Sequence, residues 1–121
     1  MNILIIDDDA EFLRPIFACF PANIRWAATR PVMENELSTS EFDAIMMDGS
    51  LVGWGRQSGV PGHGPDVVRE LRNRGVTTKI VMFSGSDEWN KEGLTVGANS
   101  TWNKKRCYEP NWQETLLATL G

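Results

Sequence analysis

Three short apolar runs, each followed directly by a polar residue, constrain the fold of this chain most strongly. The runs and the residues after them are residues 3–6 with Asp7, residues 44–47 with Asp48, and residues 80–83 with Ser84. Continuous apolar runs of this length are typical of parallel strands that are buried on both faces. The segments between them show helical spacing, so we expect strands and helices to alternate in an α/β domain.

Weaker patterns extend this alternation to five pairs of strand and helix. Residues 24–28 alternate as an edge strand does, and residues 100–103 suggest a fifth strand. Apolar positions between Phe12 and Phe20 predict a first helix, in which Pro15 predicts a kink or an irregular start. The remaining predicted helices begin after Thr29, at Pro65, after Ser86 or Asp87, and near Trp112.

Length and charge exclude several classes of function. The 121 residues, 41% of them apolar, fit one folded domain spanning residues 1–121. With 16 acidic and 12 basic side chains, the net charge of −4 argues against direct contact with nucleic acid or an anionic membrane. The chain shows neither a membrane-spanning run nor a secretory signal, so we expect a cytoplasmic location. Cys19 and Cys107 are interpreted as reduced thiols, and the single histidine, His63, argues against a zinc site.

The polar residues that follow the strands are expected to meet. The carboxyl ends of parallel strands share one edge of the sheet, and this edge brings together Asp7, Asp8, Asp48 and Ser84. Three converging carboxylates repel one another and stay ionised most easily when a cation joins them. Because the site offers only oxygen ligands, it favours Mg²⁺. The alternative is that the acidic residues merely cap the first helix, which we consider the better interpretation for Asp9.

Four segments, in this order, resemble the receiver domains of two-component response regulators over essentially the whole chain. They are the acidic segment Ile3-Leu4-Ile5-Ile6-Asp7-Asp8-Asp9, the strand Phe42-Asp43-Ala44-Ile45-Met46-Met47-Asp48, the segment Val81-Met82-Phe83-Ser84-Gly85, and Gly97-Ala98 followed by Lys104. The resemblance implies a doubly wound, flavodoxin-like (βα)5 sandwich. Its central parallel sheet would have the strand order 2-1-3-4-5.

The resemblance also implies a phosphorelay function. Asp48 would take a phosphoryl group from a histidine kinase or phosphotransfer protein, catalysing its own phosphorylation and dephosphorylation, and the domain would then signal to a downstream effector protein. Asp8, Asp48 and the backbone carbonyl of Ser50 would ligate Mg²⁺, and Asp7 would act through bound water. The contacts to the phosphoryl oxygens would come from Ser84 and Lys104.

The chain departs from the family pattern at several positions. The segment from Gly49 to Gly64 contains six glycines and no helical or strand pattern, which predicts a mobile, inserted loop about eight residues longer than usual. Within it, Arg56 is a hypothetical extra contact to the phosphoryl group. Thr101 replaces the usual aromatic switch residue, and we expect its neighbour Trp102 to pack in the core. Lys105 replaces the usual cis-proline, which favours a trans bond here.

Two other functions remain open at this stage. The acidic segment also fits the nucleophile motif of a haloacid-dehalogenase-type phosphohydrolase acting through Asp7. A degenerate receiver would bind a partner without phosphorylation. Trp89 and Trp112 either fill the core or flank a surface for an effector or a homodimer. We expect a stand-alone receiver with no output domain after Gly121.

Overall fold

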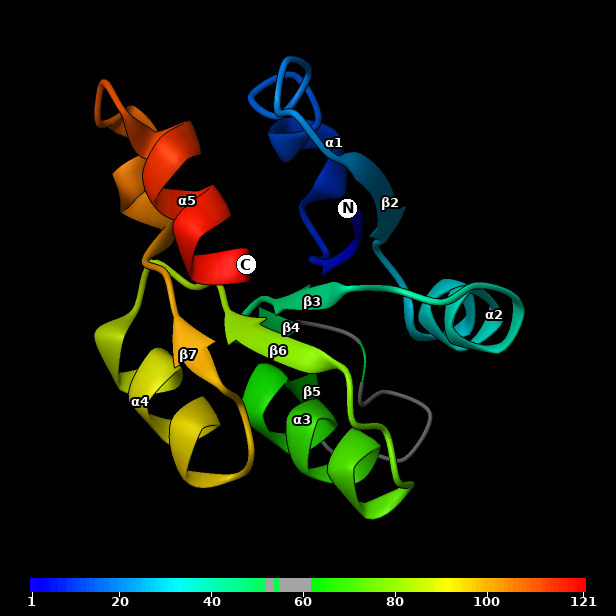
Figure 1. Cartoon of the computed structure of the whole chain (residues 1–121). Coiled ribbons are helices and arrows are strands. Elements are labelled where there is room, and N and C mark those ends of the chain that lie inside the picture. Colours follow the sequence, from blue (N-terminus) through cyan, green and yellow to red (C-terminus); the bar gives the residue numbers. More distant parts are fainter. Residues whose placement is uncertain (52–53, 55–61) are drawn as a thin grey trace.

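The computed structural model describes residues 1–51, 54 and 62–121, and its main sheet confirms the predicted fold (Figure 1). Five strands pair in parallel in the order β2-β1-β3-β6-β7. Along the chain, these strands are β1 (Asn2–Ile6), β2 (Asn23–Ala27), β3 (Ala44–Met47), β6 (Lys79–Met82) and β7 (Ser100–Thr101). Numbered among themselves, they give the expected order 2-1-3-4-5.

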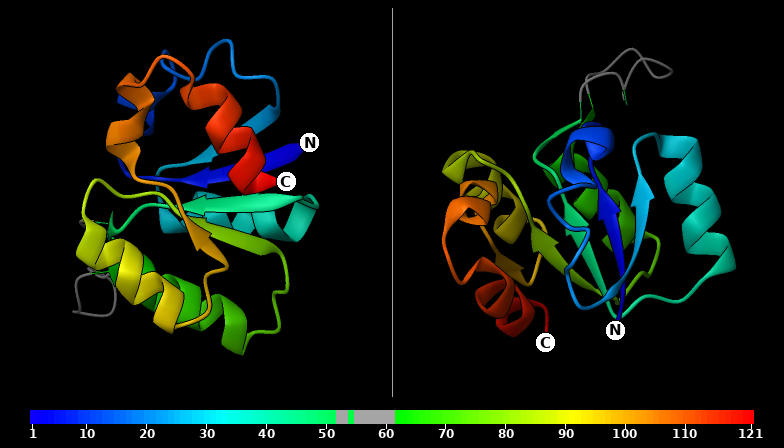
Figure 2. Two further views of the ribbon diagram at one scale, coloured as in Figure 1. Left: turned by 60° about the vertical axis from the view of Figure 1, so that its left-hand side comes forward. Right: turned by 90° about the horizontal axis from the view of Figure 1, so that it is seen from above.

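Helices cover both faces of this sheet, as the figures show from three directions (Figures 1 and 2). Alternate residues of β1, β3 and β6 point into two separate apolar clusters. One cluster includes side chains from α2 (Arg30–Thr39) and α3 (Gly64–Asn73), and α4 (Asp87–Thr95) packs beside α3. The other cluster includes side chains from α1 (Ala10–Leu13) and α5 (Trp112–Leu120). Both faces of the central strands are therefore buried, which explains their continuous apolar sequence.

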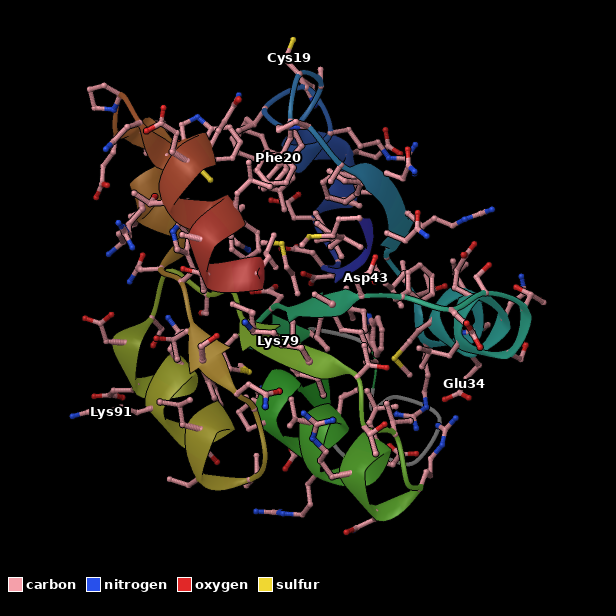
Figure 3. The ribbon with its side chains drawn as sticks, in the orientation of Figure 1. Cys19, Phe20, Glu34, Asp43, Lys79 and Lys91 are labelled. Carbon is pink, nitrogen blue, oxygen red and sulfur yellow. The ribbon has the colours of Figure 1, made fainter. Side chains whose placement is uncertain are left out.

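The first helix is shorter than the apolar spacing predicted. It ends at Leu13, and the chain then continues in turns towards Phe20. Pro15 has no N–H to donate to the preceding helical turn, and its ring would clash with the carbonyl there. Phe12, predicted on the buried face, is 61% exposed, whereas Phe20 packs in the core. Cys19 points outward beside it (Figure 3).

The segment from Gly49 to Gly64 contains strand structure at both ends, so the prediction that it has none was wrong there. β4 (Ser50–Leu51) pairs antiparallel with β5 (Gly62–His63). Two-residue strands are too short to produce a recognisable alternation in sequence. Leu51 is fully buried, and Trp54 is only 7% exposed, with its indole N–H donating to the carbonyl of Ala28 at 3.1 Å. Arg56 lies outside the described residues.

The carboxyl-terminal third matches most of the sequence expectations. Trp102 is buried in the core and stacks on Phe83. The described residues contain no cis peptide bond, so the bond before Lys105 is trans, as expected. It lies in the short 3-10 helix η1 (Lys104–Tyr108). Trp112 is half-buried and stacks on Phe20, which favours the core-filling interpretation for this residue. Among the described helices, none is long and apolar enough to cross a membrane.

Candidate functional site

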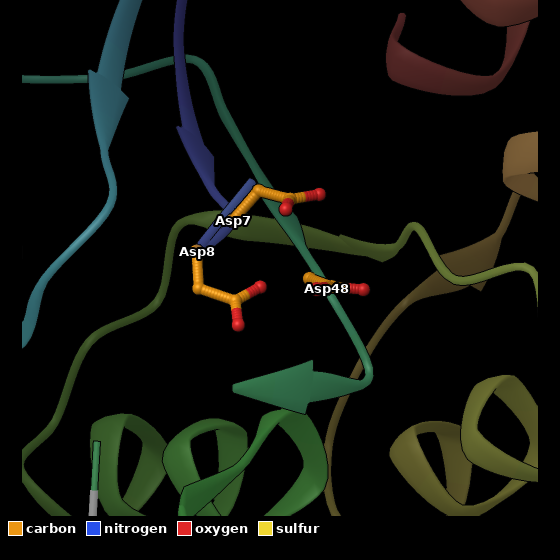
Figure 4. Close-up of side chains that lie close together, drawn as sticks. All are labelled: Asp7, Asp8 and Asp48. Carbon is orange, nitrogen blue, oxygen red and sulfur yellow. The ribbon is translucent and has the colours of Figure 1, made fainter. Parts of the chain in front are cut away.

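Three carboxylates meet at the carboxyl ends of β1 and β3 (Figure 4). One oxygen each from Asp7, Asp8 and Asp48 lies within 4.8 Å of the others. The cause is the register of the sheet. Ile6 and Met47, the last residues of two neighbouring parallel strands, are paired, so the residues that follow them emerge at the same edge. The predicted convergence is confirmed.

The three carboxylates differ in burial and in hydrogen bonding. Asp7 is fully buried, Asp48 is 7% exposed, and Asp8 faces solvent. Asp7 Oδ1 accepts a hydrogen bond from the backbone N–H of Asp9 at 2.8 Å. Asp48 Oδ1 accepts one from the N–H of Gly49, also at 2.8 Å. Asp9 is the residue that precedes α1, but its side chain makes no capping hydrogen bond, so the capping interpretation finds no support in this side chain.

Lys104, which begins the 3-10 helix after the edge strand β7, supplies positive charge to this group. Its Nζ lies 2.6 Å from Asp7 Oδ2 and 3.2 Å from Asp48 Oδ1. Its backbone N–H donates to the carbonyl of Ser84 at 3.1 Å, which fixes the start of η1 against the end of β6. Burial disfavours the charge on Lys104, yet the neighbouring carboxylates of Asp48 and Asp7 outweigh it and raise the pKa of the ammonium group.

One ammonium group does not balance three carboxylates. Burial, and then the charge of Asp7, raise the pKa of Asp48 to about 7. The same two causes, in the same order, raise the pKa of Asp8. A divalent cation would favour the ionised form of both groups. Since all of the ligand atoms here are oxygens, the donor set fits a hard ion such as Mg²⁺.

Ser84 lies two residues after the end of β6 and next to Gly49, the residue that follows Asp48. An ideal Cβ placed on Gly49 would lie 2.8 Å from Ser84 Oγ, so the hydroxyl adjoins the residue after Asp48. That hydroxyl oxygen accepts a hydrogen bond from the N–H of Ser86 at 3.1 Å. The structure therefore places Ser84 beside the residue that follows Asp48, at the edge of the sheet where the sequence predicted it.

Asn90 is a contributor that sequence reasoning missed. Its side chain is 4% exposed and bonds both backbone groups of Ser84: Oδ1 accepts from the N–H at 3.1 Å, and Nδ2 donates to the carbonyl at 3.0 Å. This pair of bonds fixes the end of β6 to α4. A polar residue on the buried side of a helix was the available signal, but its partner is visible only in the tertiary structure.

Ser50, the expected source of a carbonyl ligand, lies half-buried in β4. The N–H of Gly64 donates to the carbonyl of Gly49 at 2.8 Å. Successive carbonyls of a strand point to opposite edges, so the carbonyl of Ser50 faces away from β5 and is not used in that ladder. An ideal Cβ on Gly64 would stand 1.9 Å from the carbonyl oxygen of Asp48. The loop thus returns very close to the acidic site.

Known proteins resemble this chain in sequence and in fold. No family model matches it. The response regulator protein PmrA of Pseudomonas aeruginosa is 29% identical over 109 residues, which cover 86% of this chain and 46% of PmrA, so the chain spans about half the length of that relative. The receiver domain of Francisella response regulator 1452 superposes with a TM-score of 0.72 at 19% identity, covering 98% of this chain and 92% of that one. Response regulator TrrA of Thermotoga maritima, solved with Mg²⁺ and BeF, gives a TM-score of 0.73 at 16% identity and covers 99% and 98%.

The fold and the site define a doubly wound α/β domain with an acidic pocket at the carboxyl edge of its sheet. Among such domains, this chain has the fold of response regulator receiver domains, and it resembles PmrA in sequence. The resemblance inferred from the four sequence segments is therefore confirmed.

Proposed function

We propose that this domain accepts a phosphoryl group on Asp48 from the phosphohistidine of a histidine kinase or phosphotransfer protein, and that it then signals through contact with an effector protein. The observation that carries the proposal is the acidic group itself. Asp48 stands at the end of a central strand, beside two further carboxylates and within 3.2 Å of the Lys104 ammonium. A carboxylate is a competent covalent acceptor, and phosphoryl transfer depends mainly on positioning and on charge neutralisation.

The proposed transfer step assigns a role to each of these residues. A carboxylate oxygen of Asp48 attacks phosphorus, the P–N bond to the donor imidazole breaks, and the imidazole keeps the electron pair and takes up a proton. Lys104 and the hydroxyl of Ser84 would contact the phosphoryl oxygens. Asp8, Asp48 and the carbonyl of Ser50 would hold Mg²⁺, with Asp7 bound through water. When bound, Mg²⁺ supplies positive charge that stabilises the equatorial oxygens of the transferring group.

Burial argues against the phosphohydrolase alternative. That reaction needs an accessible nucleophile at Asp7, but the side chain of Asp7 is fully buried and bonded at both oxygens, to the N–H of Asp9 and to Lys104. Asp48 retains some exposure. The degenerate receiver is the remaining competitor. The complete set of acidic residues and Lys104 supports a phosphorylated receiver over it.

Intact mass spectrometry tests the proposal. The protein is incubated with acetyl phosphate with and without Mg²⁺, beside the Asp48→Asn variant. We expect one added phosphoryl group in the wild type with Mg²⁺, and none in the variant or without the ion. Steady release of inorganic phosphate from phosphate esters, abolished by Asp7→Asn, would favour the hydrolase. The absence of both an adduct and turnover would favour the degenerate receiver.

A further inference from the structure

The side chain of Trp89 touches both sides of the loop that follows the acceptor. Its ring stacks on the ring of His63, with centroids 4.4 Å apart and planes inclined by 29°. On the other side, an ideal Cβ on Gly49 would lie 2.6 Å from Trp89 Cβ, so the first turn of α4 packs against the residue after Asp48. Trp89 is itself held in place, because its backbone N–H donates to the Ser86 side chain that caps α4.

β5, the strand that contains His63, is too short to be rigid alone. β4 and β5 are two residues each and form a separate two-stranded sheet, and isolated short ladders are marginally stable. In this ladder Ser50 is paired with His63. The position of the Ser50 carbonyl therefore depends on what fixes β5. The ring of His63 is held by the stack on Trp89, since its Nδ1 is buried and has no hydrogen-bond partner in the described part of the chain.

We infer that Trp89 and His63 are positioning residues that fix the Ser50 carbonyl for Mg²⁺ and thereby set the preference of the site for this ion. The inference rests on the proposed metal site. Mg²⁺ requires near-octahedral geometry at short ligand distances, whereas Ca²⁺ accepts longer and more variable ones. A backbone ligand that loses its support therefore weakens Mg²⁺ binding far more than Ca²⁺ binding. Supporting residues around a metal commonly change its affinity by about 10- to 100-fold.

Calorimetric titration of Mg²⁺ and Ca²⁺ into the full chain and its variants tests this inference. We expect His63→Ala and Trp89→Leu each to raise the Mg²⁺ dissociation constant about tenfold, while the Ca²⁺ constant changes less than about threefold. His63→Phe keeps an aromatic ring to stack on Trp89 and is expected to restore most of the Mg²⁺ affinity. The matched control is Trp112→Leu, which removes the same ring from the cluster on the opposite face of the sheet.

Each outcome of the titrations supports or overturns the inference. Urea unfolding of every variant establishes that it is folded under the conditions of the titration. Wild-type binding of Mg²⁺ together with unchanged constants in both variants would overturn the positioning role alone. An equal loss of affinity for Mg²⁺ and Ca²⁺ would also overturn it, because a general loosening of the fold would weaken the binding of both ions alike. A wild type that binds no Mg²⁺ would overturn the proposed metal site and the inference with it.

Discussion

Replacing Asp48 by asparagine is expected to stabilise the metal-free protein, and increasingly so as the pH rises. Burial raises the pKa of Asp48 from 3.8 to about 7 in the folded protein. Between these two values, the folded state retains a proton that the unfolded chain has released. The free energy of unfolding of the wild type therefore falls as the pH rises through this window, and this contribution levels off above pH 7.

The size of this effect on the free energy of unfolding follows from the pKa shift of Asp48. One pKa unit corresponds to about 1.4 kcal/mol, so the full window corresponds to about 4 kcal/mol at most. Asparagine has nearly the same shape and stays neutral, so it avoids this cost. It also loses the 3.2 Å ion pair with Lys104, which offsets part of the gain. We expect the free energy of unfolding of Asp48→Asn to exceed that of the wild type by about 1 to 3 kcal/mol at pH 8, and by much less near pH 4.

Urea unfolding in EDTA between pH 4 and pH 8 measures this difference. Glu41→Gln, which removes a carboxylate from an exposed loop position, serves as the matched control. Adding Mg²⁺ at pH 8 is expected to stabilise the wild type more than Asp48→Asn, because an ion that binds only the folded state stabilises it by mass action. Parallel pH profiles for the wild type and Asp48→Asn would refute the reasoning that burial suppresses ionisation of Asp48.

Three further substitutions have expected outcomes that follow from single contacts. Gly64→Ala places a Cβ 1.9 Å from the Asp48 carbonyl oxygen, and the backbone shift this forces is expected to cost about 2 to 3 kcal/mol in urea unfolding and to slow phosphorylation. Arg72→Met removes donors to three backbone carbonyls, so we expect a loss of about 2 to 3 kcal/mol in urea unfolding, with phosphorylation at 25 °C unchanged. Trp54→Phe removes the donor to the Ala28 carbonyl. We expect it to lower the free energy of unfolding by about 1 kcal/mol, which is measured as a lower Tm.

The central strands and the acidic group could be predicted from the sequence because a single physical cause produces both. Strands buried on both faces have continuous apolar sequences, and residues that follow parallel strands meet at one edge of the sheet. The proximity of Asp7 and Asp48 could therefore be predicted without knowing the conformation of any loop. The position of Lys104 came from the family resemblance, since no local pattern distinguishes it from the neighbouring Lys105.

The parts that were missed depend on a helix-breaking proline and on individual side-chain contacts. The apolar spacing from Phe12 to Phe20 fits a helix, but Pro15 prevents its continuation, and Phe17 and Phe20 reach the core from turns instead. The bonds between Asn90 and Ser84 cross the short turn from β6 to α4, and the stack of Trp89 on His63 joins α4 to β5, which lies far from it in the sequence. Neither leaves a periodic signal.

Locating the modified residue tests the central claim most directly. After incubation with acetyl phosphate and Mg²⁺, borohydride reduces an aspartyl phosphate to homoserine, and peptide mass spectrometry then identifies the position. We expect homoserine at residue 48 alone. Homoserine at residue 7 or 8, or an unmodified Asp48 in a protein that carries the phosphoryl group elsewhere, would contradict the assignment of Asp48 as the acceptor.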